Sequence, residues 1–106
     1  VNPETKIVCA EPTKGHYIQG LKNMEEAIVP AIYDPSKIDV NIMVESEDAF
    51  EMARELALKE GVFTGMSSGA ALYAAVEIAK TIESGTIVVL SADRGEKYLS
   101  TELFHV

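Results

Sequence analysis

The sequence predicts an α/β domain built on an open, mostly parallel sheet with flanking helices. Short apolar runs rich in β-branched residues are combined with longer stretches of helical periodicity, in the order strand, connector, strand, helix, helix, strand. The last run is apolar on both faces, which is typical of an interior parallel strand. A chain of 106 residues is the size of one domain, so we expect a single domain over residues 1–106.

The first half of the chain is expected to supply two strands. Ile7–Ala10 is a short apolar run with β-branched residues, and it ends before Pro12, which steers the preceding residue away from helix. Residues 13–35 hold several glycines and prolines and predict a long irregular connector, of a kind that often forms the wall of a site. Ile38–Val44 alternates apolar and polar side chains over most of its length, as a half-buried strand does.

Two helices and a final strand are expected in the second half. Ser46 stands before two acidic residues, the pattern of an N-cap followed by acidic first-turn side chains, and Gly61 marks the end of this amphipathic helix. Residues 69–84 are mostly apolar and predict a buried helix whose small side chains allow close approach of neighbouring backbone. Gly85 then ends the helix before Ile87–Leu90, the run that is apolar on both faces.

The composition excludes several classes of function. Seventeen acidic and nine basic residues give a net charge of −8, which repels the phosphates of nucleic acid, so no nucleic-acid partner is expected. No apolar run approaches the roughly 20 residues that span a bilayer, and the start lacks a signal peptide's pattern, so we expect a cytoplasmic protein without membrane contact. Cys9 is the single cysteine and the two histidines lie far apart, so neither a disulfide nor a metal site is expected.

The most informative stretch runs from Glu60 to Ala71, between the two expected helices. Its glycines and its adjacent Ser67 and Ser68 stand at the mouth of a buried helix, where free backbone N–H groups meet the positive end of the helix dipole. From the spacing alone, either serine can be a simple N-cap, with the glycines as turn residues. The alternative is that a hydroxyl faces a cofactor.

Three segments in a fixed order carry a family resemblance. Residues 60–71 read Glu-Gly-Val-Phe-Thr-Gly-Met-Ser-Ser-Gly-Ala-Ala, residues 16–20 read His-Tyr-Ile-Gln-Gly, and residues 93–101 read Asp-Arg-Gly-Glu-Lys-Tyr-Leu-Ser-Thr. Together they resemble the cysteine synthase family of fold-type-II pyridoxal-phosphate enzymes across nearly the whole chain. The Asp-Arg-Gly form and the basic residue Lys22 are most similar to the cysteine synthase B type. We therefore expect the fold of the C-terminal part of such an enzyme.

The resemblance implies cofactor-binding roles for two residues. Ser67, the first serine of the pair, stands where the family hydrogen-bonds the pyridine nitrogen of pyridoxal 5′-phosphate, and Gly20 stands where the backbone comes close to cofactor and substrate. A hydroxyl stabilises a positively charged ring less than a carboxylate does, and a helix N-terminus disfavours that charge further. The resulting weaker electron sink suits expulsion of a β-substituent from a serine-type substrate. Without its flanking match, Gly20 is equally well interpreted as a plain turn glycine.

Other polar residues are given no catalytic role. Lys22 is interpreted as a surface lysine, and His16, although it fits the loop motif, as a surface or hydrogen-bonding histidine. Cys9 lies in the first expected strand without an activating neighbour, so we expect a small core residue rather than a nucleophile. The Ser91–Arg94 segment departs from the common family form, which leaves the leaving group and the sulfur donor open.

The Schiff-base lysine of the family and its glycine-rich phosphate loop have no counterpart in this chain, which begins at Val1 without a methionine. We therefore expect a C-terminal part of a longer enzyme that carries one wall of the cofactor site, holds no catalytic residue and is inactive alone. The resemblance implies that the complete enzyme makes L-cysteine from O-acetylserine or O-phosphoserine and sulfide by β-replacement, as a homodimer. A cystathionine β-synthase, which takes homocysteine, and a non-enzymatic α/β partner module stay open as alternatives.

Overall fold

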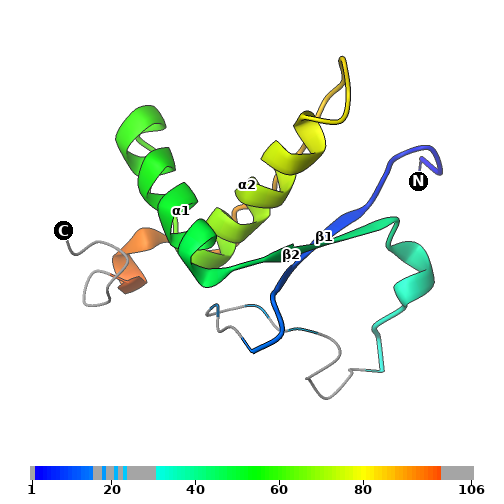
Figure 1. Cartoon of the computed structure of the whole chain (residues 1–106), viewed down its shortest axis with the longest axis horizontal. Coiled ribbons are helices and arrows are strands. Elements are labelled where there is room, and N and C mark those ends of the chain that lie inside the picture. The colour runs from blue at the N-terminus through cyan, green and yellow to red at the C-terminus, as the bar shows by residue number, and fades with distance from the viewer. Residues whose placement is uncertain (1, 16–17, 19–20, 22, 24–30, 99–106) are drawn as a thin grey trace.

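The computed structural model describes residues 2–15, 18, 21, 23 and 31–98 (Figure 1). The described elements follow the order β1 (Val8–Pro12), the 3-10 helix η1 (Pro35–Lys37), β2 (Val40–Val44), α1 (Ser46–Glu60), α2 (Met66–Ala79) and the 3-10 helix η2 (Gly95–Tyr98). The two strands form a parallel sheet, and both α-helices follow it in the chain. The α/β class predicted from the sequence is therefore confirmed. No helix among the described residues is long and apolar enough to cross a membrane.

The parallel pairing of β1 and β2 runs in register from Val8 opposite Val40 to Pro12 opposite Val44. Backbone hydrogen bonds extend the ladder at its start, where the Asp39 and Val40 N–H groups both donate to the Ile7 carbonyl at 2.9 and 3.1 Å. The strand β1 continues through Pro12, so the expectation that it stops at residue 10 was wrong. A proline is tolerated here because it closes a strand that pairs on one side only and needs no N–H there.

The N-cap of helix α1 lies one residue earlier in the chain than expected. Glu45 occupies the N-cap position without a side-chain hydrogen bond, and Ser46 is the first helical residue rather than the cap. The end agrees with the prediction, because Gly61 adopts the left-handed conformation at φ 69° and donates its N–H to the Ala57 carbonyl at 3.1 Å. Left-handed backbone favours glycine, which has no Cβ to clash.

Because nothing lies within 4 Å of a Cβ built on Gly61, a Gly61→Ala substitution tests the backbone conformation by itself. We expect it to lower the free energy of unfolding by about 1 kcal/mol, the cost of placing an L-residue in left-handed backbone. Urea unfolding curves measure this loss. Gly61→Asn is the matched control and should lose less, because asparagine enters this region more readily. Equal losses for both variants would contradict the explanation.

The helix α2 runs from Met66 to Ala79 rather than over the expected residues 69–84. Its early start places both serines of the informative stretch inside the first turn. Its early end has a local cause, because Thr81 directs both its N–H and its hydroxyl to the Ile78 carbonyl, at 2.9 and 2.7 Å. A side chain that takes up a helix carbonyl in this way competes with continuation of the helix.

The two helices meet through their N-terminal halves and diverge towards their C-terminal ends (Figure 1). At the meeting point, a Cβ built on Gly69 of α2 would lie 2.2 Å from the Ala49 carbonyl oxygen and 3.0 Å from the Ala53 Cβ, both in α1. Small side chains therefore let the helix backbones touch, as the sequence predicted. Around this contact lies the buried cluster, formed by Ile18, Val44, Ala49, Ala53, Met66 and Ala70.

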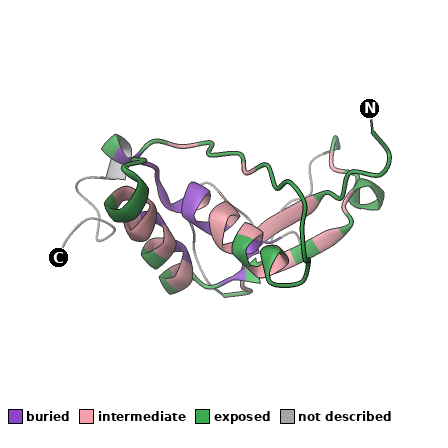
Figure 2. Cartoon of the chain, turned by 90° about the horizontal axis from the view of Figure 1, so that it is seen from above, coloured by how far each residue is buried: buried purple, intermediate pink, exposed green. Residues whose placement is uncertain are grey.

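The run Ile87–Leu90 forms no strand, so the prediction of an interior parallel strand was wrong for the described residues. Val88 is 89% exposed and Leu90 is 79% exposed. Figure 2 shows this segment as an exposed stretch outside the helices. An interior strand needs a hydrogen-bonded neighbour on each side, and the described strands β1 and β2 pair only with each other. An apolar pattern alone does not supply those neighbours.

Candidate functional site

The candidate site is the first turn of α2 together with two loops that meet there. The segment before α2 and the segment after residue 92 lie side by side, because Thr64 and Arg94 form an isolated antiparallel bridge. The Gly95 N–H also donates to the Phe63 carbonyl at 3.2 Å. A Cβ on Gly95 would lie 2.4 Å from the Phe63 ring, so a larger residue here would displace that ring. The chain thereby returns to the beginning of α2 after leaving its far end.

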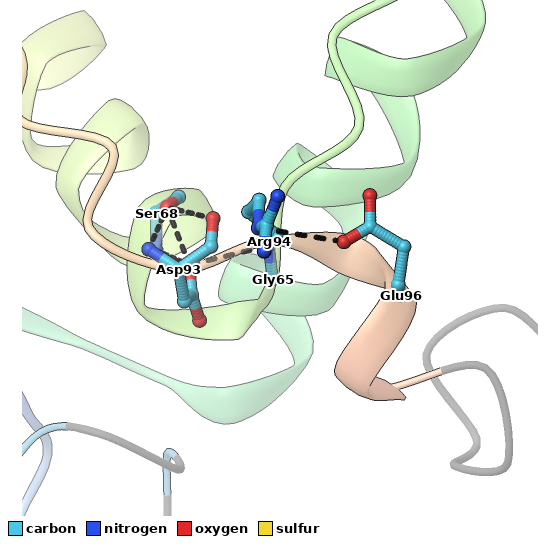
Figure 3. A network of polar contacts seen from close by, with 5 residues as sticks. All are labelled: Gly65, Ser68, Asp93, Arg94 and Glu96. Atoms are coloured by element: carbon cyan, nitrogen blue, oxygen red, sulfur yellow. Dashed lines mark hydrogen bonds and ion pairs between the residues drawn. The ribbon is translucent and has the colours of Figure 1, made fainter.

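The Asp93 carboxylate caps the N-terminal turn of α2 from this second loop (Figure 3). Its Oδ1 accepts the N–H groups of Gly65 and Ser68, each at 3.2 Å, and its Oδ2 accepts the N–H of Ser67 at 3.3 Å. The first N–H groups of a helix have no partner within the helix, and a negative charge is stabilised at that end by the dipole. One carboxylate therefore satisfies three donors at once.

The two adjacent serines have different environments. Ser68 is 1% exposed, donates its hydroxyl hydrogen to the Asp93 carboxylate, and accepts the Asp93 N–H at 3.4 Å. Ser67 is half-buried, and its hydroxyl has no hydrogen-bond partner among the described residues. Both are helical residues that follow the N-cap Gly65, so the interpretation of either serine as a simple N-cap was wrong. Ser68 belongs to the scaffold, whereas no described residue occupies the Ser67 hydroxyl.

A second hydroxyl lies close in sequence to this turn without a partner. Thr64 is 5% exposed, and its Oγ1 is the single buried side-chain oxygen or nitrogen in the described part of the chain that makes no hydrogen bond. A buried hydroxyl without a partner costs stability, so such groups are uncommon outside sites where a ligand supplies the bond. Thr64 and Ser67 flank Gly65 and Met66, so the orphaned oxygens gather at one end of α2.

The charged groups nearest the turn are arranged asymmetrically. Asp93 faces the helix, whereas Arg94 pairs with Glu96 at 3.5 Å on the side away from Ser68 (Figure 3). The side chains of that pair are 79% and 57% exposed, so solvent screens it strongly. The Asp93 carboxylate is thus the charge that acts directly on the first turn of α2.

The loop motif at residues 16–20 is only partly placed. Gly20, Lys22 and His16 lie outside the described residues, so their expected roles stay predictions. Ile18, in the middle of the motif, is fully buried and belongs to the same cluster as Met66 at the start of α2. Leu21 donates its N–H to the Ile18 carbonyl at 3.0 Å. Through Ile18, the described part of the motif packs in the same core as the start of α2.

Cys9 lies in β1, half-buried, at a distance in sequence from every element of the site. Burial raises the pKa of its thiol, and the negative charge of Glu11 raises that pKa further. A thiol with a raised pKa is protonated at neutral pH and is a poor nucleophile. This agrees with the expectation that Cys9 is not catalytic. Among the described residues, no three histidine, cysteine, aspartate or glutamate side chains gather as metal ligands.

Sequence reasoning missed the role of Asp93. The residue was noticed only as part of the Asp-Arg-Gly variant of the closing motif, while capping was sought in the serines beside the helix. A weak signal was present, because Gly65 has no side chain with which to cap α2. The actual cap comes from a residue 25 positions after Ser68. No local pattern connects positions so far apart.

The sequence of this chain is similar to the sequences of known enzymes. Residues 1–93 match the family described as pyridoxal-phosphate dependent enzymes. A cysteine synthase of Aquifex aeolicus is 45% identical over 97% of this chain and 33% of its own length. A cysteine synthase B of Pseudomonas aeruginosa is 34% identical over 97% of this chain and 34% of its own length.

The fold is also similar to that of a solved enzyme. The crystal structure of a cysteine synthase from Entamoeba histolytica superimposes with a TM-score of 0.87 at 35% identity, covering 97% of this chain and 33% of that one. The chain therefore spans about a third of the length of these relatives. The resemblance to cysteine synthases seen in the three motifs is confirmed. The match over residues 1–93 shows that this chain belongs to the family of pyridoxal-phosphate dependent enzymes.

Proposed function

We propose that this chain forms one wall of the cofactor site of a cysteine synthase. In this proposal the complete enzyme makes L-cysteine from an activated serine and sulfide by β-replacement. The observation that carries it is the Ser67 hydroxyl in the first turn of α2, which has no hydrogen-bond partner in the described part of the chain, beside a Ser68 hydroxyl that Asp93 occupies. The similarity to proteins named cysteine synthase supports the choice of reaction.

The residues of the turn fit the ring of pyridoxal phosphate, the cofactor of the family. Ser67 carries a hydroxyl that donates one hydrogen bond, which matches an unprotonated pyridine nitrogen, an acceptor. In the proposal, Gly20 leaves room for the cofactor because it has no side chain. When bound, pyridoxal phosphate supplies an electron sink that helps a substituent leave the β-carbon of an amino acid. Ser67 keeps that electron sink moderate, because its hydroxyl donates a hydrogen bond to the ring nitrogen but does not protonate it.

The scaffold around the turn has its own task in this reaction. Met66 and Ser68, on either side of Ser67, are buried, so the turn cannot rotate to offer a different residue. The backbone that carries the Ser67 hydroxyl is therefore held in place. A fixed donor costs little reorganisation when it binds its acceptor, which is how preorganised polar groups contribute to catalysis.

The identity of the activated serine and of the sulfur donor belongs to the proposal. We take O-acetylserine and O-phosphoserine as the two candidate substrates, with sulfide as the second. A cystathionine β-synthase would use the same wall of the cofactor site but take homocysteine. We also propose that the complete enzyme is a cytoplasmic homodimer. Light scattering in solution measures its mass and so tests this oligomeric state.

The test uses the protein translated from the complete reading frame that contains this chain. The purified protein is supplied with pyridoxal phosphate, sulfide and each activated serine in turn, and cysteine is quantified. We expect cysteine from at least one of them, and no cysteine from the isolated residues 1–106. Absence of cysteine with both substrates would rule the proposal out. Cystathionine formed from homocysteine in its place would favour the cystathionine β-synthase, and a reading frame without a Schiff-base lysine would favour the partner module.

A further inference from the structure

We propose that Asp93 is the residue that positions the Ser67 hydroxyl and sets the electrostatic potential around it. The inference rests on the proposed function, because it takes Ser67 to face the pyridine nitrogen. Asp93 is then a positioning residue, since it acts on the cofactor through Ser67 and the first turn of α2.

The geometry of the cap carries the positioning role. Asp93 accepts the N–H of Ser67 itself at 3.3 Å and the N–H groups of Gly65 and Ser68 at 3.2 Å. The backbone is thus fixed at Ser67 and on both sides of it. The carboxylate also holds the Ser68 hydroxyl, which keeps that side chain away from any ligand. Of the two adjacent hydroxyls, only that of Ser67 has no hydrogen-bond partner among the described residues.

The charge of Asp93 carries the electrostatic role. An uncapped helix N-terminus has a positive end of roughly half an elementary charge, which disfavours a positive ring beside it. Here a full negative charge lies on that end, within hydrogen-bond distance of the Ser67 backbone. The potential at the Ser67 hydroxyl is therefore set by helix and carboxylate together. Arg94 and Glu96 largely cancel each other, because they are paired and exposed.

An asparagine at position 93 changes both contributions with little change in the shape of the side chain. If its oxygen takes the place of Oδ1, it keeps the bonds to Gly65 and Ser68, and its amide NH2 then faces the N–H of Ser67. The opposite orientation would lose more bonds. Asp93→Asn therefore damages the contact to Ser67 selectively and removes the negative charge.

The experiment uses the complete protein loaded with pyridoxal phosphate that carries the NMR-active nitrogen isotope in its ring. The chemical shift of that nitrogen reports its hydrogen bonding directly, independently of turnover. We expect Asp93→Asn to move the signal towards that of an unbonded pyridine, in the same direction as Ser67→Ala does. The Kd of the cofactor should rise about 2- to 13-fold, the factor expected for one weakened hydrogen bond.

Glu96→Gln is the matched control, because it removes one negative charge from the same loop without touching α2. It should leave the ring signal and the cofactor Kd as in the wild type. Asp93→Ser is the second variant, because its shorter side chain removes the negative charge and withdraws the acceptor oxygens from the first turn of α2. It should move the ring signal in the same direction as asparagine does. Circular dichroism verifies that each variant is folded.

The outcomes separate this inference from the proposed function. A wild-type ring signal in both folded Asp93 variants would overturn the inference, and so would loss of folding in both, since Asp93 would then serve stability alone. If Ser67→Ala shifts the signal and the Asp93 variants do not, the role of Ser67 stands and that of Asp93 fails. If the Asp93 variants shift the signal while the enzyme makes no cysteine, the inference stands and the proposed reaction fails.

Discussion

The Gly69→Ala variant is expected to unfold much more easily than the wild-type protein. Its new Cβ would lie 2.2 Å from the Ala49 carbonyl oxygen, a backbone atom that moves only if α1 moves with it. Overpacking of this kind costs about 1–3 kcal/mol and sometimes more. Alanine is a better helix former than glycine by about 1 kcal/mol, which offsets part of that loss. We expect the clash to win, because the helices must separate along their closest contact.

Urea unfolding of the wild type and the variant measures the loss at Gly69. Gly61→Ala is the matched control, because it adds the same methyl group where nothing lies within 4 Å. Because the clash at Gly69 involves a backbone atom at 2.2 Å, its cost should lie at or above the upper end of the overpacking range, and the net loss should exceed the loss at Gly61. Separation of the helices should also weaken cofactor binding, since Gly69 lies two positions after Ser67 in the same helix. A Gly69→Ala protein as stable as the wild type would contradict the close approach of α1 and α2.

Substitution of Ser67 is expected to change the chemistry and leave the fold nearly intact. The Ser67 hydroxyl makes no hydrogen bond to a described residue, so Ser67→Ala should change the free energy of unfolding by no more than about 0.5 kcal/mol. It should weaken cofactor binding by the value of one neutral hydrogen bond, about 0.5–1.5 kcal/mol. Ser68→Ala is the matched control with the opposite result, because its hydroxyl is buried and bonded to Asp93. It should lower stability by about 1 kcal/mol and leave the cofactor absorbance unchanged.

Ser67→Asp is expected to reduce turnover more than cofactor affinity. A carboxylate favours a protonated ring and strengthens the electron sink, which slows a β-elimination that a moderate sink serves best. It also places a second negative charge in the turn that Asp93 already caps, so no benefit from capping offsets the change. Cofactor absorbance and steady-state rates of the three serine variants measure both effects. A fully active Ser67→Asp enzyme would exclude contact between Ser67 and the pyridine nitrogen.

Local features made much of the fold predictable from the sequence. The end of α1 was predictable because Gly61 adopts positive φ easily. The predicted N-cap of α1 differs from the observed one by a single position. The alternation in residues 38–44 indicated the strand that forms β2. The small residues of α2 indicated a close helix contact. Each of these features depends on residues a few positions apart, so a pattern in the sequence records them.

The sequence by itself determined the α/β class, the order of the described elements and the segment that carries Ser67. Only the tertiary structure decided which of the two hydroxyls the scaffold occupies, because Asp93 reaches Ser68 across 25 positions and binds its side chain. It likewise decided that Ile87–Leu90 joins no described ladder, since a strand exists only where a neighbour offers hydrogen bonds. Contacts between residues distant in the chain depend on how loops close and helices pack. The local periodicity of the sequence predicts neither of these.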